Sequence, residues 1–126
     1  MKRRTVVASV IALRGIEDLA FAQNKEKQMY GLIGKMIAQE GKLDELLAIM
    51  LGDSAPLAGC LSYVIAKDPA DANGLWITEV WDSKDSHAAS LALPAVKKMI
   101  AAARPLIAGF SNRTETIPVG GQGLKG

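Results

Sequence analysis

The sequence predicts a single α+β domain in which a four-stranded antiparallel sheet carries helices on one face. Three observations lead to this fold class. Segments with alternating apolar residues and segments with helical spacing follow one another as strand, helix, strand, strand, helix pair, strand. A run of turn-forming residues, Lys67–Gly74, joins the two middle strands as a hairpin. The 126 residues, nearly half of them apolar, suffice for one core.

The first strand is predicted over Tyr30–Ala38, where apolar residues alternate between two faces. Gly31 and Gly34 weaken this strand and let another group approach its backbone closely. Gly41 then interrupts the chain before a helix that Gly52 ends. The apolar residues of this helix recur at the helical spacing, at Leu43, Leu46, Leu47 and Met50.

The second and third strands are predicted over Gly59–Ala66 and Leu75–Trp81. Simple alternation places Cys60 and Tyr63 on opposite faces of the second strand. A short helix follows the third strand, capped by Asp82 or Ser83.

Pro94 suits the first turn of the next helix, which Pro105 ends or kinks. Gly109 is expected to turn the chain outward before the last strand, Phe110–Val119. The complete order is the β-α-β-β-α-β ferredoxin-like pattern.

A carboxylate stands out on the third strand. Glu79 shares a strand face with Ile77 and Trp81, and a buried carboxylate needs a partner or gives up its charge. His87, the one histidine of the chain, follows on the next helix. An acid, an indole and an imidazole are therefore expected at one strand-to-helix corner. The alternative is that Glu79 forms a structural ion pair with a basic residue, namely Arg104, Arg113 or Lys35.

Three segments together resemble the antibiotic biosynthesis monooxygenase (ABM) domain, and more narrowly its quinol monooxygenase branch. They are TEVWDSKDSH, LPAVKKMI and RPLIAGF, within a resemblance that covers about residues 30–119. The resemblance implies a dimeric α+β barrel and an oxidation of a hydroquinone or related aromatic by O₂ without a cofactor. Many members carry a histidine nine residues after the tryptophan, where this chain has Ser90, whereas His87 lies six residues after Trp81.

On this resemblance, Glu79 and His87 are the candidate catalytic residues, handling protons, while Trp81 and Tyr63 bind the substrate. Each has a plainer alternative: His87 as a solvent-facing helical residue and Tyr63 as an ordinary strand residue. Trp76 and Trp81 lie on opposite faces, so at most one lines a given pocket. Cys60 is most simply a small apolar residue.

No flavin, haem or metal site is visible in the sequence, so no cofactor is predicted. One histidine and one cysteine do not make a usual zinc site. Two alternative functions remain on the same scaffold: a non-oxidative isomerase, and a stress or binding protein that holds a small aromatic without turnover. A haem-degrading relative would need His87 as the iron ligand, and a Soret band on mixing with haemin would reveal it.

A homodimer is predicted because the helices cover one face, while the first and third strands carry large apolar residues on both. Residues 1–22 read as a signal peptide, with Lys2-Arg3-Arg4, an apolar run and an A-x-A site before Gln23, or else as an N-terminal extension. Export to the periplasm is expected in the first case and a cytoplasmic location in the second. The apolar run is too short for a stable membrane span.

Residues 23–29 are predicted to be a linker and residues 120–126 a flexible tail. The formal charge of +2 comes from residues 1–22, and the rest is neutral, which excludes the basic surface of a nucleic-acid-binding protein.

Overall fold

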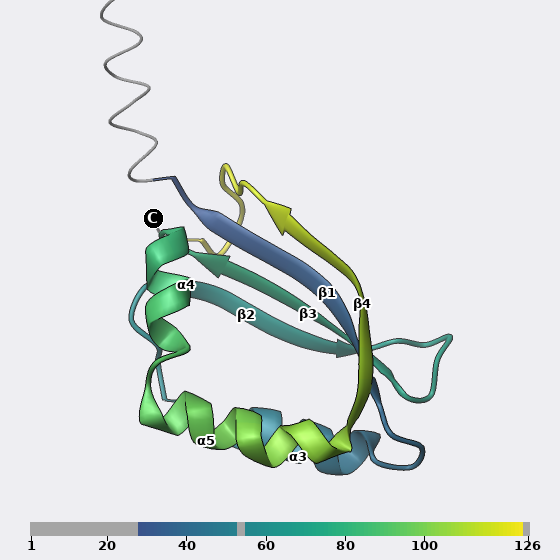
Figure 1. Cartoon of the computed structure of the whole chain (residues 1–126). Helices are drawn as coiled ribbons and strands as arrows, with labels where there is room; N and C mark the ends of the chain where they lie inside the picture. The colour runs from purple at the N-terminus through teal and green to yellow at the C-terminus, as the bar shows by residue number, and fades with distance from the viewer. Residues whose placement is uncertain (1–27, 53–54, 125–126) are drawn as a thin grey trace, which may run out of the picture.

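The computed structural model of the chain describes residues 28–52 and 55–124 (Figure 1). The predicted leader over residues 1–22 lies outside the described residues. The elements, in chain order, are β1 (Tyr30–Ala38), α3 (Leu43–Gly52), β2 (Cys60–Lys67), β3 (Gly74–Trp81), α4 (Lys84–Ser90), α5 (Pro94–Ala103), a 3-10 turn (Arg104–Leu106) and β4 (Ile107–Thr116).

The four strands form one antiparallel sheet in the order β2-β3-β1-β4. Figure 1 shows α3 and α5 crossing one face of this sheet and α4 standing at one end of it. The predicted ferredoxin-like fold class is therefore confirmed. We call the sheet face toward the helices the inner face, and the opposite face the outer face.

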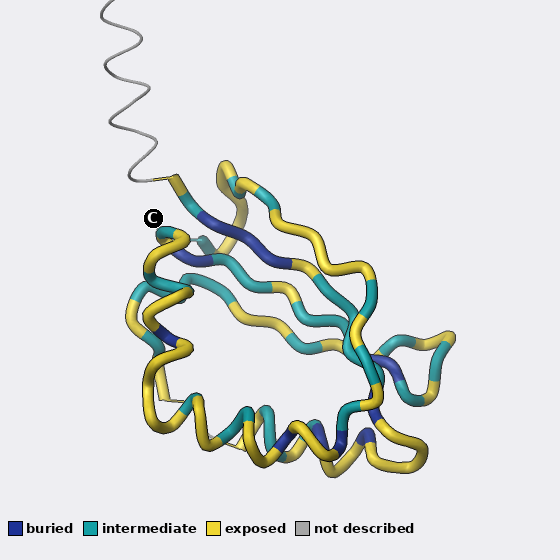
Figure 2. The backbone as a smooth tube through the Cα atoms, in the orientation of Figure 1, coloured by how far each residue is buried: buried dark blue, intermediate teal, exposed yellow. Residues whose placement is uncertain are grey.

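Two groups of buried residues hold the helices to the inner face. The larger group joins α3, the 3-10 turn and the sheet, and Leu46 and Leu75 are fully buried in it. The smaller group consists of Tyr30, Leu32 and Trp81, at the end of the sheet near α4. Figure 2 shows that burial concentrates on the middle strands β1 and β3, whereas β2 and β4 are more exposed.

The last strand begins earlier than predicted. β4 starts at Ile107 instead of Phe110 and ends at Thr116. Gly109 does not turn the chain outward but pairs with Ile37 of β1. These residues of β4 pair with β1 in the antiparallel sheet, and such long-range pairing outweighs the local tendency of a glycine to interrupt a strand.

The predicted assignment of β2 side chains to the two sheet faces is also wrong at the start of the strand. The register with β3 shifts between Cys60 and Ser62, so Cys60 lies opposite Trp81 and Tyr63 lies opposite Glu79. A bulge adds one residue and so reverses the faces of the residues before it. As a result, Cys60 and Tyr63 share the inner face, whereas simple alternation separates them.

An ion-pair cluster on the outer face fastens the β2–β3 hairpin to β1. Lys35 Nζ lies 3.0 Å from both Asp68 Oδ2 and Asp71 Oδ2. Trp76 Nε1 donates a hydrogen bond of 3.1 Å to Asp68 Oδ2, which places this indole on the outer face. The Ala70 backbone N–H and Lys35 hold the pKa of Asp68 below its usual value. Lys35 is the main cause of the lowered pKa of Asp71.

We expect Lys35→Met to lower the melting temperature at neutral pH, with the difference from wild type closing as the pH falls below the unfolded carboxyl pKa of 3.8. A lowered folded pKa stabilises the fold fully above the unfolded value, and this stabilisation is lost as the pH falls through the folded pKa and the carboxylates are protonated. The raised pKa of Lys35 stabilises the fold fully below its unfolded value, and that stabilisation is lost only as the pH rises through the folded pKa, well outside this acidic range. Thermal melts across this pH range test the prediction. Lys42→Met, which removes an exposed pair with Glu45, is the control, and equal destabilisation at every pH would contradict the prediction.

Candidate functional site

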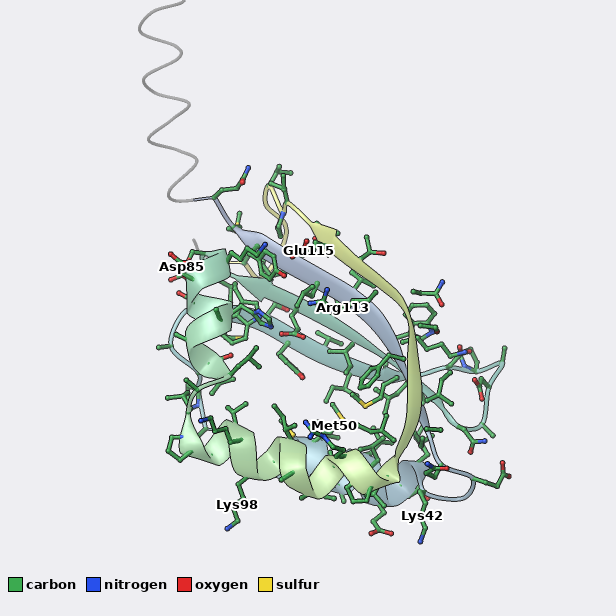
Figure 3. All side chains as sticks on the ribbon, in the orientation of Figure 1. Lys42, Met50, Asp85, Lys98, Arg113 and Glu115 are labelled. Carbon is green, nitrogen blue, oxygen red and sulfur yellow. The ribbon has the colours of Figure 1, made fainter. Side chains whose placement is uncertain are left out.

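A cavity of about 1010 Å³ lies between the inner face of the sheet and helices α4 and α5. Its lining is mostly apolar, with a few polar side chains, as in small-molecule sites. Figure 3 shows the side chains of the strands reaching into the space that the helices border. All four predicted site residues line this cavity, namely Tyr63, Glu79, Trp81 and His87.

The Glu79 carboxylate is held through one of its oxygens. Trp81 Nε1 donates a hydrogen bond of 2.9 Å to Glu79 Oε1, and His87 Nε2 lies 3.9 Å from the same oxygen. The second oxygen, Oε2, has no hydrogen-bond partner among the described residues. A positioned carboxylate with one free oxygen in an apolar cavity can accept a proton from a ligand.

His87 is held between two aromatic rings. The centroids of the Tyr30 and Trp81 rings each lie 5.4 Å from that of the imidazole, the Trp81 ring edge-on. The His87 side chain is only 15% exposed, so it is not a solvent-facing helical residue. This packing fixes the imidazole next to Glu79.

The backbone before α4 fixes this corner. Ser83 caps α4 by accepting a hydrogen bond from the Ser86 backbone N–H. Gly59 accepts a hydrogen bond of 2.8 Å from the Asp82 N–H and has a φ of 84°. A Cβ on Gly59 would lie 2.5 Å from the Ser86 side chain. A glycine is therefore required for the loop before β2 to pack against the helix that carries His87.

The structural ion pair considered for Glu79 is not present. Among the described residues, no lysine or arginine lies within 4.0 Å of Glu79, and the neighbour of its carboxylate within that distance is the His87 imidazole. Lys35 is occupied on the outer face by Asp68 and Asp71.

Tyr63 and Cys60 lie beside Glu79 on the inner face. Desolvation and then the Glu79 charge raise the pKa of the Tyr63 hydroxyl, which remains a hydrogen-bond donor at neutral pH. Burial, with a smaller effect of Glu79, raises the pKa of the Cys60 thiol. A protonated thiol is a poor nucleophile, which agrees with the apolar role expected for Cys60. Trp81 lines the cavity, whereas Trp76 lies on the outer face.

Ser90, nine residues after Trp81, also lines the cavity. It is 5% exposed, and its hydroxyl donates a hydrogen bond of 2.6 Å to the His87 carbonyl oxygen. Residues three apart share a helix face, so His87 and Ser90 point toward the same cavity from successive turns.

Sequence reasoning did not assign a site role to Tyr30 or Arg113. The Tyr30 hydroxyl donates a hydrogen bond of 2.5 Å to Glu115 Oε2, and Lys84 Nζ lies 3.5 Å from the same oxygen. The alternation of β1 could have placed Tyr30 on the inner face with Leu32. Arg113 lines the cavity from β4, where a register shift hides its face from simple alternation.

Within residues 28–52 and 55–124, no three histidine, cysteine, aspartate or glutamate side chains gather closely enough to hold a metal ion. In the same part of the chain, no helix is long and apolar enough to cross a membrane.

The sequence profile of the antibiotic biosynthesis monooxygenase family matches residues 29–102. Among solved structures, a protein of Chloroflexus aurantiacus named as a candidate antibiotic biosynthesis monooxygenase is 56% identical, over 77% of this chain and 99% of its own, with a TM-score of 0.74. A protein of Caulobacter crescentus with the same kind of name is 20% identical, over 80% of this chain and 99% of its own, with a TM-score of 0.68. At that identity the likeness shows the fold alone. No match was found among the curated proteins. The chain belongs to the antibiotic biosynthesis monooxygenase family.

Proposed function

We propose that the protein is a cofactor-independent monooxygenase that oxidises a hydroquinone or related electron-rich aromatic with O₂. The observation that carries this proposal is the arrangement of Glu79. Trp81 and His87 both lie at Oε1, while Oε2 is left without a described partner at an apolar cavity. The family supports monooxygenase-like chemistry in general terms, and the quinol substrate is our own inference.

In the proposed reaction, Glu79 removes a proton from a hydroxyl group of the substrate. The neighbouring imidazole of His87 stabilises the protonated Glu79 or relays the proton onward. The resulting phenolate is electron-rich enough to reduce O₂ itself. A hydroquinone and O₂ then give a hydroxyquinone and water, so the substrate supplies all the electrons. Tyr63, a donor at neutral pH, stabilises the developing anion by a hydrogen bond, and the apolar lining strengthens that interaction.

Oxygen uptake by the purified protein, measured against a panel of hydroquinones, tests the proposal. We expect uptake to depend on both substrate and enzyme and to yield the hydroxylated quinone. Binding of the aromatic without oxygen uptake would instead identify a binding protein. Conversion without oxygen consumption would identify an isomerase.

The outer face supports a homodimer as part of this proposal. Ile33 and Val64 flank Thr78 in one row across the sheet, and they are 38% and 53% exposed. Within the described part of the chain, helices cover only the inner face, so a second copy packed on the outer face would bury these side chains.

We expect the wild-type protein to be a dimer at micromolar concentration and Val64→Asp to be a monomer, because a carboxylate opposite an apolar surface is costly to bury. Size-exclusion chromatography with light scattering measures both. Val119→Asp is the control, since Val119 lies beyond β4 and is exposed. A wild-type protein that is folded and monomeric would rule out the dimer.

A further inference from the structure

Arg113 reaches the cavity because β4 is irregular. Ile33 pairs with Thr114, but Lys35 pairs with Ser111, so two residues of β4 lie opposite the single residue Gly34. Asn112, one of these two, has a φ of 54°, a left-handed conformation that asparagine tolerates. The extra residue leaves Arg113 on the inner face, where its side chain lines the cavity. Figure 3 shows Arg113 in front of the sheet, within the space bordered by α4 and α5.

The floor of the cavity beside Arg113 is open. Gly34 lines the cavity and lies on β1, between β3 and β4. A Cβ built on Gly34 would have the Arg113 Cα, at 3.7 Å, as its nearest neighbour, an ordinary contact distance. The glycine is therefore not required by packing within the described residues. Its missing side chain leaves room for a flat ligand against the sheet.

Arg113 retains the capacity to bind an anion. Among the described residues, no carboxylate lies within 4.0 Å of its guanidinium group. Glu115, a nearby carboxylate, is already bonded by Tyr30 and paired with Lys84. The Tyr30 hydroxyl, then Lys84 and, more weakly, Arg113 lower the pKa of Glu115, so this carboxylate is shared.

The spacing of Arg113 and Glu79 suits one aromatic ring. Glu79 lies on β3 and Arg113 on β4, with β1 between them. Two strand spacings separate their backbones by about 10 Å across the sheet, and the two residues from Leu32 to Gly34 offset them by about 7 Å along it. Side chains that extend from both strands over Gly34 can bracket a single substituted ring.

We infer that Arg113 binds a carboxylate group of the substrate, so that the substrate class is a hydroxylated aromatic carboxylate held with its hydroxyl group toward Glu79. This inference rests on the proposed function for the role of Glu79. The planar guanidinium group donates two parallel hydrogen bonds to a carboxylate, which fixes the orientation of the ring as well as adding affinity.

Binding measurements on the full chain test this inference without requiring turnover. The probes are gentisate, a para-dihydroxylated benzoate, and its neutral amide, gentisamide. Isothermal titration calorimetry gives the affinity of each for the wild type, Arg113→Met and Arg104→Met. Arg104 is the matched control, because it is an arginine that lines the cavity from the 3-10 turn.

We expect the wild type to bind gentisate about tenfold to a hundredfold more tightly than gentisamide, as for a charge-assisted hydrogen-bonded pair. Arg113→Met should abolish this preference and Arg104→Met should retain it. The wild-type preference should also shrink as salt is raised, because Arg113 is exposed. This salt dependence requires no variant, so it remains informative if Arg113→Met does not fold.

Equal affinity of the wild type for the two probes, no binding of either, or a preference that survives Arg113→Met would overturn the inference. So would a preference that depends on Arg104. Oxygen uptake with neutral hydroquinones in any of these cases would leave the proposed function standing. A clear preference for gentisate without oxygen uptake would support the binding role of Arg113 and contradict the proposed monooxygenase function.

Discussion

Glu79→Gln is expected to lower the rate of oxygen uptake by about 10²-fold or more, while the protein keeps its fold. The amide matches the carboxylate in shape, and its oxygen can still accept the hydrogen bond of 2.9 Å from Trp81. It cannot accept a proton from the substrate, however. The loss should therefore appear in kcat with little change in melting temperature.

The small thermal effect follows from the identity of the partner. In a buried ion pair between a carboxylate and a lysine or arginine, removing the carboxylate charge leaves the cation uncompensated, which costs about 3–5 kcal/mol of stability. For Glu79, by contrast, no lysine or arginine of the described residues lies within 4.0 Å, and the neighbour at Oε1 is His87 Nε2, 3.9 Å away. A drop in melting temperature of about 10 °C or more, equal to one or two kcal/mol in a domain of this size, would instead indicate a structural role.

The matched control for this variant is Glu115→Gln. Leu32 of β1 pairs with Glu79 on one side and with Glu115 on the other, so the two carboxylates occupy one row of the inner face. Glu115 is bonded by Tyr30 and Lys84, so its conversion to an amide should leave most of the activity. Equal losses from the two variants would contradict a specific role for Glu79.

His87→Ala is expected to lower oxygen uptake by about 10²-fold, at the lower end of the usual range for an acid–base group. The imidazole is the one titratable group of α4 that lies within 4.0 Å of Glu79, and it is packed between Tyr30 and Trp81. Its loss removes the partner that would relay the proton from Glu79. Steady-state oxygen uptake with the best hydroquinone of the panel measures the effect.

Moving the histidine by one turn separates its chemistry from its packing. In a His87→Ala background, Ser90→His places an imidazole three residues further along the same face of α4. We expect this double variant to recover part of the lost activity. Ser90→Ala alone, which removes only a hydroxyl bonded to the His87 carbonyl, should cost little. Wild-type activity in His87→Ala would exclude the proposed role.

The alternation of apolar residues was enough to predict the fold class and most element positions. It also placed Glu79 and Trp81 on one face of β3, because successive side chains of a regular strand alternate. Asp82 or Ser83 was predicted to cap α4, and the cap is Ser83. These features depend on residues close in the chain, which is why the sequence alone determined them.

What only the tertiary structure decided are the features that depend on pairing between strands. The bulge in β2 puts Cys60 beside Tyr63, and the irregular register of β4 turns Arg113 into the cavity. A single extra residue in one strand reverses faces without changing local composition, so alternation misassigns them. The sequence likewise left the partner of Glu79 open between His87, expected at the same corner, and three basic residues as the alternative. Folding places the imidazole of His87 there, because α4 packs over the end of β3 and buries that side chain between two rings.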